Sequence, residues 1–167
     1  MDTMTLVFMA GSNPVSWLIR TITRSRTSHV AIGTMLHGVP VLIQADFGGV
    51  QVSPRAQYLK RARVVAEFRW PGDPTVELER ACRRLGEKYD YVGLLGFGFV
   101  VLARWFKRKA RNPLSSPSAT VCSELVRGID PGGDVVPEWK ALDPEQTTPE
   151  DLLDVCMASS VFEKVQQ

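Results

Sequence analysis

Five short stretches rich in β-forming residues follow one another within the first 70 residues, and they constrain the fold more than any other feature. The turns Leu36-His37-Gly38 and Gly48-Gly49 separate consecutive stretches by only a few residues, which favours antiparallel hairpins. We therefore expect an antiparallel sheet at the centre of the fold. Its predicted strands are Thr5–Met9, His29–Met35, Val39–Asp46, Val50–Val52 and Ala62–Trp70.

Helical patterns surround these strands, with apolar residues three and four positions apart. The last predicted helix begins at Thr148-Pro149-Glu150-Asp151, where a hydroxyl cap precedes proline and two acids. Residues 129–146 are expected to be an irregular surface segment, and Ser160–Val165 is a candidate edge strand. The pattern predicts a single α+β domain over residues 1–167, an antiparallel sheet packed against helices. The predicted helices are 14–22, 54–60, 75–87, the apolar segment 92–106, a short helix at Cys122, and the one after Thr148.

The charges are unevenly distributed along a chain whose net charge is only +2. Residues 1–128 carry 18 Lys and Arg against 9 Asp and Glu, whereas residues 129–167 carry 2 against 9. Either one face meets an anionic partner or the acidic tail folds back over the basic body, and we expect the second. The basic cluster Lys107–Arg111 is expected to be a solvated helix end, with contact to an anionic membrane or cell wall as the alternative. No aromatic platform accompanies it, so nucleic-acid binding is not expected.

Cysteine usage and the N-terminus point to a reducing environment. Cys82, Cys122 and Cys156 lie far apart without a CxxC pair, so we expect neither a disulfide framework nor a metal site, and no motif indicates a cofactor. The N-terminus lacks the charged and apolar regions of a signal peptide, and segment 92–106 is too short for a transmembrane helix, which needs about 20 residues. The expected location is the cytoplasm or a phage virion. Cys82 and Cys156 fall on apolar helix stripes and are expected in the core.

Cys122 lies in the first turn of its predicted helix. Thr120 is the expected N-cap, and Gly128 supplies the stop. The backbone N–H groups that converge on a first turn favour a thiolate over a thiol and can also receive an oxyanion. The alternative is a small apolar residue that only packs the helix.

A thiol nucleophile needs a base, and the chain has only two histidines. His37 falls at a hairpin tip, where an exposed and inert imidazole is expected. His29 opens a strand directly after a polar loop, and a hydrogen-bonded strand-end histidine is its alternative interpretation. On the returning strand, Gln44 and Asp46 point to the same face, and either can accept from the imidazole N–H. Asp46 is expected instead to begin the following turn, and Gln44 has the alternative of a solvent-facing polar residue.

The histidine segment precedes the cysteine segment along the chain. In this order, the two segments resemble the circularly permuted branch of the papain-like NlpC superfamily, the YiiX-like proteins, with lecithin retinol acyltransferase as a more distant relative. The resemblance extends over roughly residues 5–157 and implies a permuted papain-like fold. It implies Cys122 as the nucleophile, His29 as the general base and Gln44 as the orienting residue. The segments are Ser28-His29-Val30-Ala31-Ile32, Val41-Leu42-Ile43-Gln44-Ala45 with Gly49-Val50, Tyr89-Asp90-Tyr91, and Val121-Cys122-Ser123-Glu124-Leu125-Val126.

The resemblance also implies an activity. It predicts a cysteine hydrolase, an amidase or endopeptidase that acts on peptidoglycan stem peptides through an acyl-enzyme. A lipid acyl hydrolase or acyltransferase is the alternative enzyme, and a non-catalytic phage tail module, with phage tail or lysis proteins as partners, is the alternative outside enzymes. Many relatives have a Glu-Ala pair where this chain has Gln44-Ala45. An amide orients an imidazole but does not stabilise an imidazolium by charge.

Overall fold

The computed structural model describes residues 3–89, 119–143 and 147–166. The predicted helix 92–106 and the basic cluster Lys107–Arg111 lie outside the described residues. None of the helices in the described ranges is long and apolar enough to cross a membrane. The elements, in chain order, are β1 (Thr5–Gly11), α1 (Pro14–Thr23), β2 (His29–Leu36), β3 (Val39–Asp46), β4 (Gly49–Pro54), α2 (Arg55–Tyr58), β5 (Ala62–Arg69), α3 (Thr75–Arg83), β6 (Lys88–Tyr89), β7 (Ala119–Thr120), α5 (Cys122–Arg127), the 3-10 helix η1 (Pro137–Ala141), α6 (Pro149–Ala158) and β8 (Glu163–Lys164).

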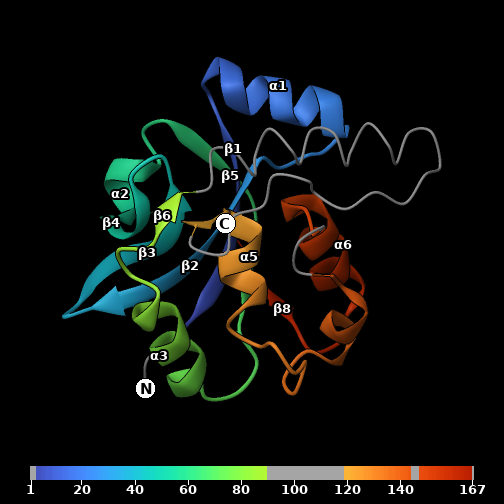
Figure 1. The fold of residues 1–167 in the computed structure, drawn as a ribbon. Coiled ribbons are helices and arrows are strands. Elements are labelled where there is room, and N and C mark those ends of the chain that lie inside the picture. The colour runs from blue at the N-terminus through green and yellow to red at the C-terminus, as the bar shows by residue number, and fades with distance from the viewer. Residues whose placement is uncertain (1–2, 90–118, 144–146, 167) are drawn as a thin grey trace.

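A six-stranded antiparallel sheet forms the centre of the fold, in the order β4-β3-β2-β1-β5-β8 (Figure 1). The two hairpins that the sequence predicts join β2 to β3 and β3 to β4, whereas α1 lies between β1 and β2. At the β2–β3 turn both His37 and Gly38 have positive φ, 47° and 81°, as tight hairpin turns require. The strand predicted within Ser160–Val165 is β8, at the edge of the sheet. The predicted α+β class with an antiparallel sheet is therefore confirmed.

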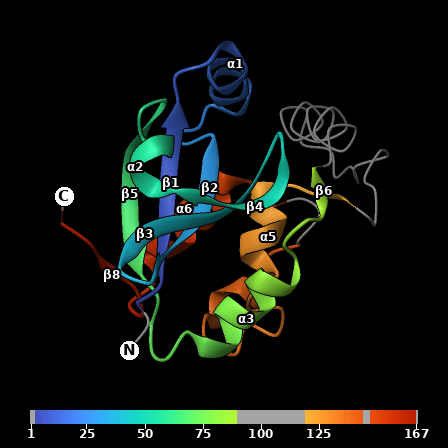
Figure 2. The same ribbon diagram turned by 90° about the vertical axis from the view of Figure 1, so that its left-hand side faces the viewer.

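Helices cover both faces of the sheet, because each face carries every second residue of the strands. Figures 1 and 2 show α5 and α6 on one side and α2 on the other. Leu6 and Phe8 of β1 face the larger core, whereas Val7 and Met9 face the smaller one under α2. The larger core also contains Val30, Ile32, Ile43, Phe68, Trp70, Cys122, Val126, Trp139, Leu152, Leu153 and Cys156.

The described part of the segment 129–146 is not irregular surface, contrary to the sequence-based expectation. It contains the 3-10 helix η1, and its apolar residues Ile129, Val136 and Trp139 are fully buried in the larger core.

The acidic C-terminal region folds back over the basic body, as the charge distribution predicts. Arg26 pairs with Glu150 at 2.5 Å and with Asp154, and Arg69 pairs with Glu163 at 3.7 Å. Glu150 also accepts the backbone N–H of Arg26 at 2.8 Å. Exposed ion pairs stabilise a fold by only about 0–1 kcal/mol each. The contact of Glu150 therefore acts mainly by tying the loop before β2 to the start of α6.

Cys82 is not a core residue, contrary to the sequence-based expectation. Helix α3 ends at Arg83 rather than at residue 87, and Ala81 is its buried apolar position. Successive helical residues are about 100° apart around the axis. Because Ala81 faces the core, Cys82 turns outward and is exposed. The expectation for Cys156 is confirmed, since it is 1% exposed.

The cysteine helix begins later than the sequence predicts. Thr120 is not its N-cap, because Thr120 belongs to β7 and pairs in parallel with Tyr89 of β6. Val121 takes the cap position, and its backbone N–H donates to the Glu124 carboxylate at 3.2 Å. Cys122 is therefore the first residue of α5. The expected first-turn position of the cysteine is confirmed.

Leu6 offers a direct test of the central strand. We expect Leu6→Ala to lower the free energy of unfolding by about 2–5 kcal/mol, because it removes a fully buried side chain and leaves a cavity. Leu36→Ala at the hairpin tip, where the side chain is 52% exposed, makes the same chemical change and should cost less than about 0.5 kcal/mol. Urea unfolding of both variants measures the difference. Equal losses would contradict the described core.

Candidate active site

Cys122 lies at the start of α5, where the helix packs against β2 and β3. Leu125 and Val126 anchor the helix because both are fully buried. The helix ends at Gly128, as the sequence predicts. Cys122 is 7% exposed, so its thiol is largely shielded from solvent.

His29 and Gln44 meet across neighbouring strands. His29 is the first residue of β2, and its Nε2 lies 2.9 Å from Oε1 of Gln44 in β3. Gln44 is fully buried, and its Nε2 donates to the Ser53 hydroxyl of β4 at 3.2 Å. Because the amide nitrogen donates to Ser53, the amide oxygen faces the imidazole and accepts a hydrogen bond from its Nε2–H. This contact fixes the tautomer and leaves Nδ1 for a second partner.

That second partner is Cys122, whose sulfur lies within hydrogen-bonding reach of the imidazole and, as a thiolate, attracts the imidazolium by its charge. The structure thus brings Cys122, His29 and Gln44 into one chain of contacts, although the sequence separates the cysteine from the histidine by most of the chain. The backbone N–H groups of Val30 and Ser123 also donate to the sulfur. His37 lies exposed at the hairpin tip, away from this group.

The thiol and the imidazole favour each other's charged form. Burial raises the pKa of Cys122 and is the largest single effect, but the His29 charge, its hydrogen bond and the N–H groups of Val30 and Ser123 together bring this pKa below its usual value. Burial likewise lowers the pKa of His29, yet the Cys122 thiolate and the Gln44 oxygen raise it above its usual value. Both shifts favour a thiolate–imidazolium pair, the nucleophilic form of a cysteine.

Asp46 adds a negative charge to this site. As predicted, it begins the β3–β4 turn, where its Oδ1 accepts from the Gly48 N–H at 3.0 Å and from Gln51 Nε2 at 2.6 Å. It also raises the pKa of His29 through its charge, a contribution that the sequence analysis missed. Gln44 and Asp46 are two residues apart in one strand and therefore lie on the same face, and this spacing was the sequence signal for the contribution of Asp46.

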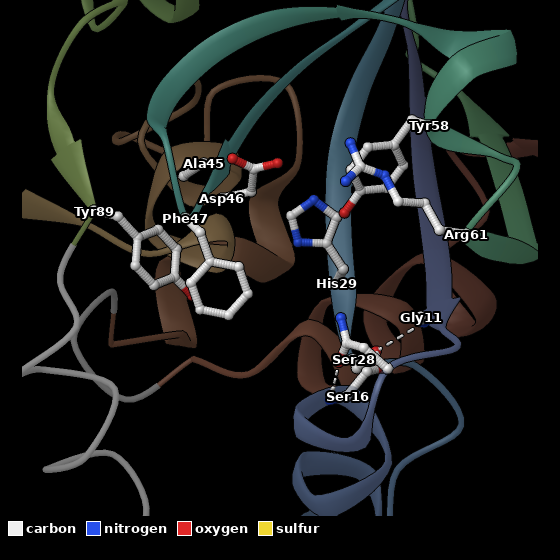
Figure 3. A pocket seen from close by; sticks show the side chains of 11 residues that line it. Gly11, Ser16, Ser28, His29, Ala45, Asp46, Phe47, Tyr58, Arg61 and Tyr89 are labelled. Atoms are coloured by element: carbon white, nitrogen blue, oxygen red, sulfur yellow. Dashed lines mark hydrogen bonds between the residues drawn. The ribbon is translucent and has the colours of Figure 1, made fainter.

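A cavity of about 120 Å³ opens beside the imidazole. Figure 3 shows Tyr58 and Arg61 on one side of His29, and Phe47 and Tyr89 on the other. The Tyr58 ring lies 5.6 Å from the imidazole, centroid to centroid, at an angle of 31°. Burial raises the pKa of Tyr58, so its hydroxyl stays protonated. The cavity is lined by Gly11, Asn13, Ser16, Ser28, His29, Ala45, Asp46, Phe47, Tyr58, Arg61 and Tyr89.

Sequence reasoning did not find Tyr58 or Arg61 as part of this site. Tyr58 ends the four-residue helix α2, and Arg61 lies in the turn that follows. Neither belongs to a motif, and they reach the imidazole only because α2 covers the sheet face beside β3. A lone aromatic residue in a short helix carries no signal that could have identified this role.

Comparison with known proteins supports the α+β fold. No protein-family model matches the sequence, and no curated protein matches it. Among solved structures, the chain is similar to the crystal structure of the metalloprotein YiiX from Escherichia coli O157:H7, with a TM-score of 0.60 and 16% sequence identity. The match covers 99% of this chain and 96% of that one. At this identity the likeness concerns the fold alone, and the chain has a YiiX-like fold.

The description of YiiX as a metalloprotein raises the question of a metal ligand set in this chain. In residues 3–89, 119–143 and 147–166, no group of three or more His, Cys, Asp and Glu side chains is arranged to hold a metal ion. Around His29, the side chain that accepts its Nε2–H is an amide, and Asp46 is engaged with Gly48 and Gln51. These residues do not fit a resident metal ion.

Asp46→Asn tests the electrostatic role of Asp46. We expect it to lower the pKa of His29, because it removes a negative charge that favours the imidazolium. NMR titration of the imidazole in a Cys122→Ala background measures this shift without a coupled thiol, and His37 serves as an internal reference. Glu163→Gln, which neutralises an exposed carboxylate on β8, is the matched control. An unchanged titration in Asp46→Asn would contradict the assignment.

Proposed function

We propose that the protein is a thiol-dependent amide hydrolase of the permuted papain-like, NlpC type, and that it acts on peptidoglycan stem peptides. The observation that carries this proposal is the chain of contacts from Cys122 through His29 to Gln44. In the proposed roles Cys122 is the nucleophile, His29 is the general base and acid, and Gln44 holds the imidazole in the required tautomer. The peptidoglycan substrate rests on the resemblance of the histidine and cysteine segments.

In the first half of the reaction, the Cys122 thiolate attacks the carbonyl carbon of the scissile amide. A carbon–sulfur bond forms, and the carbonyl π electrons move to the oxygen. The backbone N–H groups of Val30 and Ser123 lie beside the sulfur and are suited to stabilise the negative charge of the attacking thiolate. When the tetrahedral intermediate collapses, the carbonyl re-forms and the carbon–nitrogen bond breaks. The His29 imidazolium gives its proton to the leaving amine nitrogen, and a thioester remains on Cys122.

In the second half, water replaces the amine. The neutral His29 imidazole takes a proton from water, and the resulting hydroxide attacks the thioester carbonyl. The carbon–sulfur bond breaks, the carboxylic acid product leaves, and the thiolate–imidazolium pair is restored. Gln44 keeps the same imidazole nitrogen directed at the sulfur throughout, since its own amide is fixed by Ser53.

Selective alkylation tests whether Cys122 is an activated thiol. We expect iodoacetamide to label Cys122 near pH 6, where ordinary thiols are almost fully protonated, because the pKa of Cys122 lies below its usual value. His29→Ala should slow this labelling by at least about tenfold at the same pH. Mass spectrometry of tryptic peptides identifies the labelled cysteine.

The other two cysteines are built-in references for this experiment. Cys82 is exposed and reports on simple accessibility, whereas burial raises the pKa of Cys156 and should keep it unreactive. Labelling of Cys82 in preference to Cys122 would count against the enzyme and favour a non-catalytic module.

Hydrolysis of purified disaccharide peptides from peptidoglycan tests the substrate. We expect Cys122→Ala to reduce amide cleavage to background, and Gln44→Leu to lower kcat by about 100-fold, because the imidazole loses its orienting acceptor. Gln57→Leu makes the same change at an exposed position of α2 and should leave kcat unchanged. The readout is the new carboxyl product, followed by mass. Release of fatty acid from lipid esters, with the peptides left intact, would replace this proposal by the lipid alternative.

A further inference from the structure

Four basic side chains gather around a hollow next to the candidate active site. Arg20 of α1 and Lys60, Arg61 and Arg63 near the start of β5 line this hollow, which has a volume of about 410 Å³. No Asp or Glu is among its described lining residues. Within the described chain, none of the four cations forms an ion pair with a carboxylate. We refer to this group as the basic hollow.

Several other arginines in the described residues have carboxylate partners. Arg55 pairs with Glu67 at 2.6 Å, and Arg84 pairs with Glu87 at 2.8 Å. Charges of one sign that gather in a concave surface without counterions produce a local positive potential and attract anions. Arg20 donates to the Gly11 carbonyl at 2.9 Å and to the Ser16 hydroxyl at 3.2 Å. Among the described residues, the basic hollow therefore differs from these paired charges in having no carboxylate partner.

The basic hollow adjoins the cavity beside His29, because Gly11 and Arg61 line both. The Arg61 guanidinium lies over the Tyr58 ring, 5.8 Å from its centroid, and the same ring lies 5.6 Å from the imidazole of His29. Figure 3 shows the three groups side by side. A guanidinium packed on an aromatic face keeps its N–H donors, which lie in its own plane, available for a ligand.

We propose that the basic hollow, with Arg61 as its main contact, binds a carboxylate of the peptide substrate close to the amide that Cys122 attacks. This inference rests on the proposed hydrolase function and deepens it by naming the substrate class as an acidic peptide. The planar guanidinium fork matches a carboxylate in two parallel hydrogen bonds. Arg20, Lys60 and Arg63 add to the potential that draws the carboxylate in.

One wall of the cavity is polar and favours a peptide over a lipid acyl chain. Asn13, Ser16 and Ser28 present polar groups beside the imidazole, and the Ser16 and Ser28 hydroxyls lie 2.5 Å apart. A fatty acyl chain gains binding energy from a continuous apolar surface, which this wall does not provide. A short polar segment with a carboxylate matches both the cavity and the basic hollow.

Two alkylating reagents that differ only in charge test the proposal on the whole protein. With iodoacetate or iodoacetamide, the Cys122 sulfur forms a bond to the methylene carbon, and iodide leaves with the bonding electron pair. We expect the ratio of the iodoacetate rate to the iodoacetamide rate at Cys122 to fall by about fivefold in Arg61→Gln at low salt. Added salt should reduce the ratio in the unmodified protein. Arg69→Gln, at the opposite end of β5, removes the same charge elsewhere and should leave the ratio unchanged.

The outcomes separate this inference from the proposed function. If neither reagent labels Cys122, both the hydrolase and the carboxylate subsite are overturned. If both reagents label Cys122 and Arg61→Gln leaves the ratio unchanged, the subsite alone is overturned. Arg61→Lys should give an intermediate ratio, because it keeps the charge and loses the planar fork.

Protection of Cys122 from iodoacetamide identifies the source of the anion. A capped tripeptide with a central glutamate should protect better than its glutamine counterpart, and this difference should disappear in Arg61→Gln. Vesicles of phosphatidylglycerol, which present an anionic lipid surface, are tested for protection of Cys122 in the same way. Protection by these vesicles, without protection by the acidic tripeptide, would overturn the peptide carboxylate as the ligand.

Discussion

The contact between the Cys122 thiol and the His29 imidazole is the interaction on which the rest of the site depends. A thiolate and an imidazolium are costly to bury unless each is paired and hydrogen-bonded. Here the sulfur receives the N–H groups of Val30 and Ser123, and the imidazole donates to Gln44. The pair is therefore compatible with burial, whereas either charge alone would be expelled or neutralised.

The register of the sheet supplies this geometry. β2, β3 and β4 are consecutive antiparallel strands, so His29, Gln44 and Ser53 come from three neighbouring strands. Leu42 of β3 lies opposite Ser53, and Gln44 lies opposite Gln51, which makes Gln44 and Ser53 diagonal neighbours on one face. A register shift of one residue would turn Gln44 to the other face of the sheet and remove the acceptor from the imidazole. The buried apolar residues on both sides of the sheet prevent that shift, because each would also have to change face.

Local patterns made the strands, the hairpins and the capped start of α6 predictable. Thr148 caps α6 as expected, with its hydroxyl accepting the Asp151 N–H at 2.9 Å, and the Asp151 carboxylate in turn accepts the Thr148 N–H at 2.8 Å. The sequence-based predictions were wrong where tertiary contacts determine the local structure or the burial of a residue. Thr120 is a good cap by residue type, but its pairing with β6 holds it in a strand. Cys82 fits an apolar stripe by spacing, yet only the packing of α3 settles which edge of the stripe is buried.

The candidate site was predictable in its three named residues and not in its surroundings. Cys122, His29 and Gln44 stand in segments whose local pattern already suggests a first-turn thiol, a strand-end imidazole and a same-face acceptor. Tyr58 and Arg61 enter the site only through the packing of α2 on the sheet. Such a contact depends on where two separate elements meet, and no periodicity in either element encodes it.

Gln44 and Asp46 together explain how an amide can serve as the partner of the imidazole. A carboxylate at the fully buried position 44 would lose its hydration and raise its own pKa, so part of its charge would be lost. The amide at position 44 gives orientation without that cost, and Asp46, which is only partly buried, supplies the negative charge from the cavity wall. Orientation and charge are thus divided between two residues of one strand. Because Asp46 faces the cavity, a bound substrate that excludes water from it would strengthen its effect on the imidazolium.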